Sequence, residues 1–391
     1  MSNLTSTDFL KTASQTAEYF GFRSIDTLKK DKACRNCERN LKDNSSANDR
    51  KTDSLFGLLT GGATAFCEAK LHGLKGPVLF YTHEQVPRTG ESAFSFHIFN
   101  VEKSISEAIL IHTIKALMDD LGYHKNFIRI NSLGDRDSST RYTRELTNYL
   151  KKRLDLMPPT ARELMKEHPI NSLLHLLEKE HELGYKSPNP MEYLSDQSRK
   201  HFREIIEYLD MSDTSYEIDP KMIGHQDCYS EAMFSVELPE DSYPEDEAPI
   251  TVRGGRYDHF IKSKTDLKTN AAGAVVVLKN SKAPQRSPRI KLDNPSTYVV
   301  QLGFGPKVRS LMLIDTLRKA NISVLQDLAN DSLSDQLRTA EASGVKHTII
   351  IGQKEFVEDT VILRDMHARN QEHIPIDQVV RRLKRSAAVK A

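Results

Sequence analysis

The chain has 391 residues, and its 55 Lys and Arg nearly balance its 54 Asp and Glu, so the formal net charge is +1. This balance argues against a protein that binds nucleic acid over its whole surface, although a local basic face remains compatible with it. At about 100–200 residues per domain, the length predicts two or three domains. No apolar run approaches the ~20 residues that cross a bilayer, and four cysteines are too few for a disulfide framework. We therefore expect a cytoplasmic protein without a membrane partner.

Residues 1–280 show the pattern of an α+β domain built on an antiparallel sheet. Apolar residues at helical spacing predict helices over 7–20 and 105–121, closed by Gly21 and Gly122. A charged stretch at about 138–210, interrupted by proline pairs, predicts a helical segment. Strands are expected over 78–81, 94–101, 127–130, 233–238, 251–252 and 272–278, the first two forming a hairpin. Residues 30–53 are almost entirely polar and predict a mobile loop.

Residues 281–296 contain three prolines among small and basic residues, and we interpret them as a linker. Beyond them strands and helices alternate, which is typical of an α/β sheet domain over residues 297–391. The expected strands are 298–302, 323–325, 347–351 and 361–364, and the expected helices are 308–320, 331–343 and 376–384. The last helix carries Arg381, Arg382, Lys384 and Arg385. These cations suit RNA contact, and they equally suit the dipole of a helix C-terminus.

Cys34 and Cys37 have the spacing of one half of a zinc site. Neither a second cysteine pair nor paired histidines follow at a suitable distance, so one pair cannot complete a tetrahedral site. We therefore expect no metal site.

Several segments in register resemble histidyl-tRNA synthetase over almost the entire chain. Residues 16–28 are similar to that family's motif 1, residues 130–135 to its INSLG segment, and Gly254-Gly-Arg-Tyr-Asp258 to the strand before motif 3. Ser332–Gln336 and Ile349–Gly352 are similar to the class II anticodon-binding domain. The resemblance implies a class II synthetase-like catalytic domain, a C-terminal anticodon-binding-like domain, and a homodimer. The apolar stripe of the first helix and the strand region 94–101 are the surfaces that the sequence offers for the dimer.

The resemblance also assigns residues to a ligand pocket. The positions that keep the family's residue are Thr64, Glu84, Glu102, Asp227, Tyr229 and Arg256. Four other positions lose the family's charge: Gly62 stands where the family has a glutamate, and Thr82, Gly224 and Asn280 stand where it has arginines. Adenylation brings a carboxylate onto the α-phosphate, and fixed positive charge carries most of its catalysis. The departures therefore predict a retained fold with degraded chemistry.

The leading hypothesis is a histidyl-tRNA synthetase paralogue with weak or lost histidine activation, which binds tRNA, a small ligand or a protein partner; we assign it no definite cofactor. The first alternative is an active histidine–tRNA ligase that uses ATP and Mg²⁺, with Arg88, Lys279 and Arg256 covering the phosphates. The second alternative is the synthetase-like regulatory subunit of ATP phosphoribosyltransferase. Such subunits as a group usually lack the anticodon-type domain that residues 297–391 predict here.

Overall fold

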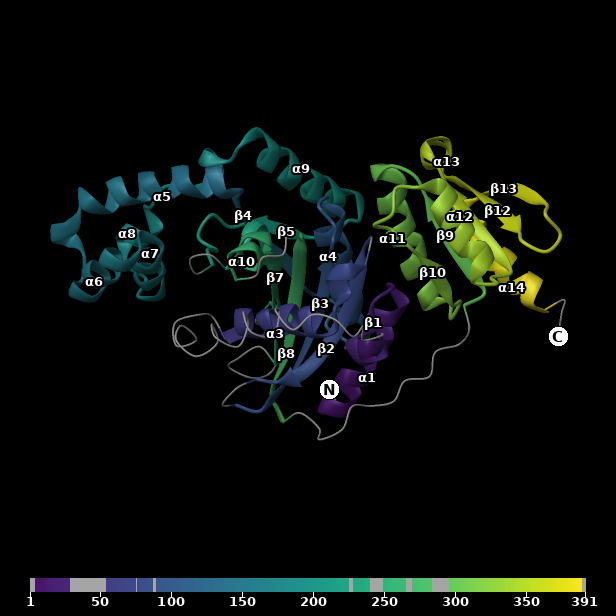
Figure 1. Cartoon of the computed structure of the whole chain (residues 1–391), viewed down its shortest axis with the longest axis horizontal. Coiled ribbons are helices and arrows are strands. Elements are labelled where there is room, and N and C mark those ends of the chain that lie inside the picture. The colour runs from purple at the N-terminus through teal and green to yellow at the C-terminus, as the bar shows by residue number, and fades with distance from the viewer. Residues whose placement is uncertain are drawn as a thin grey trace. The chain divides into compact units, whose positions relative to one another are not determined.

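The computed structural model describes residues 4–28, 54–74, 76–86, 89–224, 228–239, 249–264, 269–282 and 295–388. The chain forms two compact units, drawn in Figure 1. The first contains residues 1–6, 24–110 and 123–285, and the second contains residues 7–23, 111–122 and 286–391. Helix α4 (Ile105–Asp120) begins in the first unit and ends in the second. The loop expected over 30–53 and most of the expected linker lie outside the described residues.

An eight-stranded sheet organises the first unit, in the order β1-β2-β3-β8-β7-β6-β4-β5. In this order, every pair of neighbouring strands between β2 and β4 is antiparallel. Strand β5 lies at the edge of the sheet and is parallel to β4. The α+β prediction is therefore confirmed, including the hairpin. The strands are β1 (Arg23–Ser24), β2 (Val78–Gln85), β3 (Glu91–Phe99), β4 (Phe127–Gly134), β5 (Tyr216–Ile218), β6 (Ser230–Glu237), β7 (Ile250–Arg256) and β8 (Ala271–Lys282).

The longest helix of the first unit that the sequence-based expectations lacked is α3 (Ser54–Glu68). This helix runs across β2, β3 and β8 (Figure 1). Its apolar positions Phe56, Leu59, Ala63 and Phe66 recur at helical spacing, and each is at most 2% exposed. Three glycines and two threonines in the same stretch lower the helix propensity, so burial against the sheet rather than local preference stabilises this helix.

The helical segment expected at 138–210 is confirmed as an insert with its own core. Its helices are α5 (Arg136–Lys151), α6 (Pro159–Glu167), α7 (Pro169–Glu178), α8 (Glu182–Tyr185) and α9 (Asp196–Met211). Asp135 accepts the Ser138 backbone N–H and so caps α5, and Ser195 caps α9 in the same way. Pro159 and Pro169 begin α6 and α7, where a missing N–H costs nothing. Shorter helices are η1 (Ile25–Thr27), η2 (Leu71–Gly73), η3 (Leu154–Leu156), η4 (Pro190–Tyr193) and α10 (Asp258–Lys264).

The second unit contains a five-stranded sheet in the order β10-β9-β11-β12-β13. Strands β10, β9 and β11 are parallel, and β12 and β13 continue antiparallel, so the α/β prediction is confirmed. The strands are β9 (Thr297–Gln301), β10 (Val324–Gln326), β11 (His347–Ile351), β12 (Thr360–Asp365) and β13 (Gln371–Pro375). The helices are α11 (Phe304–Lys319), α12 (Leu333–Ala342), α13 (Gln353–Glu358), η6 (Ile376–Gln378) and α14 (Val379–Ala388). Strand β13 and helix α13 were not expected.

Helix α1 (Ser6–Tyr19) packs within the second unit. The Tyr19 hydroxyl donates to the Ile322 carbonyl, and Gln326 Nε2 donates to the Phe20 carbonyl at 2.6 Å. Asp120, at the end of α4, accepts from Thr16 and pairs with Arg318 of α11. Gly21 closes α1 as expected, with φ +87°.

This packing corrects the expected dimer surface. The stripe on α1 that was expected to face a second protomer is at most 3% exposed within one chain (Phe9, Leu10, Ala13, Ala17). The aromatic residues of β3 are buried as well (Phe94, Phe96, Phe99). Neither region offers free apolar surface, so a homodimer would use other residues. Within the described residues, no helix combines the length and apolar character needed to cross a bilayer.

Candidate functional site

Gly62 stands where the resemblance implies a glutamate, and the imidazole ring of His97 packs against it. Gly62 lies on α3 and faces His97 of β3, which is fully buried. A Cβ atom at position 62 would lie 2.0 Å from His97 Cε1 and 2.2 Å from Nε2. Real Cβ atoms do not approach other atoms this closely, so only glycine fits here while the ring keeps its place. The His97 ring therefore occupies the space that a side chain at position 62 would need.

The position where the family keeps the arginine of its histidine motif is blocked in the same manner. A Cβ atom on Gly224 would lie 2.7 Å from Tyr229 Cδ2. The Tyr229 ring in turn meets Phe56 of α3 edge-on, with 5.1 Å between ring centroids, and Phe56 also contacts Tyr257. Phe56, Tyr229 and Tyr257 thus belong to one apolar core between α3 and the sheet.

Two hydroxyl groups lie beside the His97 ring. Thr82, which stands in the place of the motif 2 arginine, has its hydroxyl 3.5 Å from His97 Nε2. The Tyr257 hydroxyl lies 3.3 Å from Nδ1. Burial lowers the pKa of His97 to about 3, so the ring is uncharged at neutral pH. Burial also raises the pKa of Glu84, the next polar residue of β2 on this face, to about 7.

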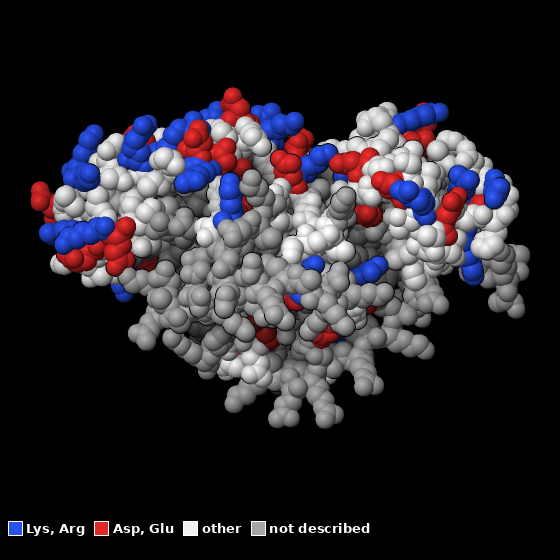
Figure 2. Space-filling model, viewed as in Figure 1, with Lys and Arg blue, Asp and Glu red and all other residues white. Residues whose placement is uncertain are grey.

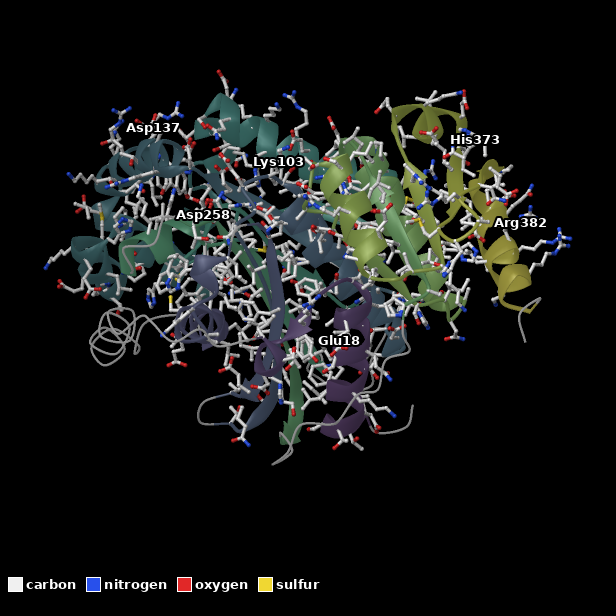
Figure 3. The ribbon with its side chains drawn as sticks, turned by 45° about the vertical axis from the view of Figure 1, so that its right-hand side comes forward. Glu18, Lys103, Asp137, Asp258, His373 and Arg382 are labelled. Atoms are coloured by element: carbon white, nitrogen blue, oxygen red, sulfur yellow. The ribbon has the colours of Figure 1, made fainter. Side chains whose placement is uncertain are left out.

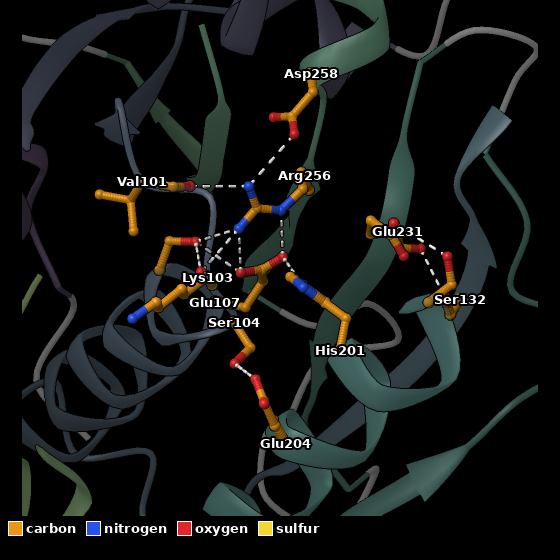
Figure 4. A network of polar contacts seen from close by, with 12 residues as sticks. Val101, Lys103, Ser104, Glu107, Ser132, His201, Glu204, Glu231, Arg256 and Asp258 are labelled. Atoms are coloured by element: carbon orange, nitrogen blue, oxygen red, sulfur yellow. Dashed lines mark hydrogen bonds and ion pairs between the residues drawn. The ribbon is translucent and has the colours of Figure 1, made fainter. Parts of the chain in front are cut away.

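Arg256 is enclosed in a network that joins β7, α4 and α9 (Figure 4). Its side chain is 1% exposed, and it forms a two-point ion pair with Glu107, with Nε–Oε1 at 2.8 Å and Nη2–Oε2 at 2.9 Å. The guanidinium also donates to the carbonyls of Val101 and Lys103 and to the Ser106 hydroxyl. Its donors are directed at protein groups, so Arg256 holds β7 and α4 together, and its ligand-contacting role stays a prediction.

The Arg256 network includes one histidine that the sequence did not single out. His201 Nε2 lies 2.8 Å from Glu107 Oε1. Burial by itself lowers the pKa of His201. The negative charge of Glu107 and its hydrogen bond to the ring have the larger effect, so the pKa is raised above its ordinary value. Arg256 and His201 together hold the pKa of the Glu107 carboxyl far below its usual range, although burial alone would raise it.

The other predicted pocket residues are not brought together. Thr64 lies on α3 and donates to the Thr60 carbonyl at 3.1 Å, within its own helix. Glu102 is exposed, and Lys279 is partly buried in β8, where its backbone N–H donates to Pro249. Arg88 and Asp227 lie outside the described residues, as does the side chain of Asn280. A signal for the covered site was present in the sequence, because two adjacent glycines fall between apolar residues at helical spacing.

The predicted RNA-binding cations lie on α14, beside a cavity of about 650 Å³ in the second unit. Arg382 (labelled in Figure 3) is neutralised by Glu372 of β13, through two hydrogen bonds of 2.8 and 2.7 Å. Lys384, Arg385 and Lys346 also line this cavity, and Arg381 lines an adjoining one of about 320 Å³. On the face shown in Figure 2, positive and negative side chains are interspersed, so any basic surface is local.

Comparisons with known proteins agree with this organisation. The "Anticodon binding domain" family model matches residues 304–386. The chain is 25% identical over 315 residues to a histidine–tRNA ligase of Geobacillus sp. (strain WCH70), covering 79% of this chain and 74% of that protein. It is 27% identical over 292 residues to the ligase of Clostridium perfringens, covering 72% and 68%. A solved apo histidyl-tRNA synthetase of S. aureus aligns over 82% of this chain and 81% of that one, with 20% identity and a TM-score of 0.47.

The domain match falls on the second unit, and the relatives align with most of the chain. The chain is therefore similar to histidine–tRNA ligases over most of its length, and its residues 304–386 are similar to an anticodon-binding domain.

Proposed function

We propose that this protein is a histidyl-tRNA synthetase paralogue that does not activate histidine and that binds tRNA through its C-terminal unit. One observation carries the first half of the proposal. Gly62 and Gly224, which replace a glutamate and an arginine of the family pattern, are the positions against which His97 and Tyr229 pack. The charges have been replaced by a packed aromatic core, which is a larger change than the loss of single side chains.

The chemistry of adenylation makes this change decisive. The attacking carboxylate and the α-phosphate are both anions, so they approach only where fixed cations stabilise the transition state. Removing one preorganised contact of this kind costs on the order of 10²–10³ in rate. Thr82 and Gly224 supply no charge, and Arg256 is directed at Glu107.

ATP and Mg²⁺ do not fit the described part of this face. A triphosphate needs several convergent donors and a cavity, whereas the groups around Gly62 are the neutral His97, Thr82 and Tyr257 under a helix. For this reason we derive no catalytic step at this position.

The second half of the proposal rests on the C-terminal unit. Its residues 297–391 hold 14 Lys and Arg against 11 Asp and Glu, an excess of three in a chain whose overall excess is one. Three of the cations on α14, Arg381, Lys384 and Arg385, line cavities beside the neutralised Arg382. The match to an anticodon-binding domain supports tRNA as the polyanion. A cytoplasmic location and a two-fold dimer are further parts of this proposal, and light scattering at micromolar concentration tests the dimer.

The test is ATP–pyrophosphate exchange with the full chain, with histidine and with each of the other nineteen amino acids. We expect no amino-acid-dependent exchange above background. Ordinary enzymes turn over at about 1–10³ s⁻¹, and histidine-dependent exchange within about a hundredfold of that range contradicts the proposal. If such exchange is lost in Arg88→Ala and Lys279→Ala, the active-ligase alternative is correct. Filter binding of the full chain to tRNA tests the second half separately.

A further inference from the structure

Glu84 is a partly buried carboxyl under a helix. It lies on β2, paired in register with Ala93 of β3, and its carboxylate faces α3. A Cβ atom on Gly61 would lie 3.3 Å from Glu84 Oε2 and 3.4 Å from Oε1, so the helix backbone rests against this group. A charged carboxylate in such a position requires either water or a countercharge.

The elements packed around Glu84 supply no countercharge within the described residues. Helix α3 has no Asp, Glu, Lys, Arg or His between Leu55 and Cys67, and its Glu68 is exposed two turns further along. On β3, Glu91 lies two residues from Ala93 and is itself acidic, and His97, four residues from Ala93 on the same face, is neutral and has the Tyr257 hydroxyl beyond it.

The adjacent charged and titratable groups do not compensate either. His83 points to the other face of β2, because successive side chains of a strand alternate. Burial lowers the pKa of His83, opposed by the charge of Asp26 on η1.

We propose that α3 is a pH-responsive cover: it closes over the sheet while Glu84 is protonated, and its opening is coupled to release of the Glu84 proton. The inference goes beyond the proposed function, since it concerns access to the covered face rather than what the protein binds or fails to catalyse. The small residues at 61 and 62 bring the helix close enough to the sheet for a single charge at Glu84 to matter.

The expected pH range follows from linkage. Burial raises the pKa of Glu84 from its ordinary 4.5 to about 7 in the closed state. In the open state water solvates the carboxyl and restores the ordinary value. The open state is therefore favoured progressively as pH rises above 4.5, and the gain levels off once the pH exceeds the closed-state value. The opening equilibrium should increase by roughly 40-fold between pH 5 and pH 7, and by only about twofold more at higher pH.

Hydrogen–deuterium exchange of the full chain tests this coupling. Protection of peptides from α3 is measured at pH 5, 6, 7 and 8, corrected for the intrinsic pH dependence of exchange, with peptides from α5, which contains no histidine, as internal reference. We expect the protection of α3 to fall by roughly 40-fold from pH 5 to pH 7 and then to level off, while α5 shows no such step. In Glu84→Gln, which is neutral at every pH, the step should disappear. In Glu91→Gln, a partly exposed glutamate at the start of β3, the step should remain.

Two outcomes overturn the proposal. One is protection of α3 in the wild-type protein with no more pH dependence than the protection of α5. The other is a Glu84→Gln variant that keeps the wild-type step. If Glu84→Gln does not fold, the wild-type measurement decides alone. Neither outcome bears on pyrophosphate exchange, so the inference and the proposed function can fail separately.

Discussion

Arg256 and Glu107 form a two-point ion pair inside the first unit, with N–O distances of 2.8 and 2.9 Å and both side chains at most 1% exposed. The pair connects the end of β7 to the first turn of α4. His201, on α9, also contacts the Glu107 carboxylate, so three elements meet at this group (Figure 4). A buried pair of this kind is costly to break, because the partner that remains is an uncompensated charge.

Arg256→Met should therefore destabilise the protein by about 3–5 kcal/mol, measured by urea unfolding. The reason is the buried Glu107 carboxylate, which keeps only His201 and Ser106 as partners. Adding Glu107→Leu should recover part of the loss, since the buried carboxylate that Arg256 paired with is then removed as well. Strictly additive effects in this double-mutant cycle would show that the two side chains do not interact.

His201 should make stability depend on pH near neutrality. Its pKa is raised by Glu107 above the ordinary 6.5, so the protonated ring contributes stability that is fully present below pH 6.5. This contribution is lost as pH rises through the folded-state pKa. His201→Gln should flatten the profile of unfolding free energy above pH 6.5, whereas His367→Gln, at an exposed histidine, should leave it unchanged. An identical slope in wild type and His201→Gln contradicts this assignment.

Two glycines of α3 offer a matched test of the covered face. Gly62→Ala should destabilise the protein by about 1–3 kcal/mol, because its Cβ collides with the buried His97 ring. Gly57→Ala has no atom within 4 Å of the new methyl group and should be neutral or stabilising by up to about 1 kcal/mol. Thermal or urea unfolding of the two variants measures the difference, and equal stability would mean that His97 moves away freely.

The cations of α14 should bind RNA with a salt dependence that reveals which of them contact phosphate. The full chain is the right material, because α1 and the end of α4 pack within the second unit. The triple change Arg381→Ser, Lys384→Ser and Arg385→Ser should reduce the slope of log affinity against log salt by about 2–3, at about 0.7–0.9 for each phosphate.

Arg382→Ser is the control for the RNA experiment. Glu372 already neutralises Arg382, so its removal should change the slope less than the loss of any one of the other three cations. Equal losses in the control and triple variants, or no binding at low salt, would exclude this helix as the RNA contact.

The sequence by itself determined the classes of structure and most of their elements. Period-3.6 stripes such as that of α1, glycine caps such as Gly21, and the alternation of strands and helices after residue 296 are local signals, and each was confirmed. Helix α3 was missed because its glycines and threonines lower local propensity, and packing on the sheet overrides that preference. The sequence also shows uncharged residues at positions 62, 82 and 224, where the resemblance to histidyl-tRNA synthetase implies charged ones.

Only the tertiary structure decided which side chains pack at these positions and which residue pairs with Arg256. That His97 fills the space beside Gly62, that Tyr229 fills the space beside Gly224, and that Arg256 pairs with Glu107 are contacts between residues far apart in the chain. The same holds for α1, whose apolar stripe is typical of a dimer helix and of a helix packed inside one chain. A periodic pattern predicts that one face of a helix is buried, but not which surface covers it. The reason is that the free energy of burying apolar area is much the same for any apolar partner that fits well.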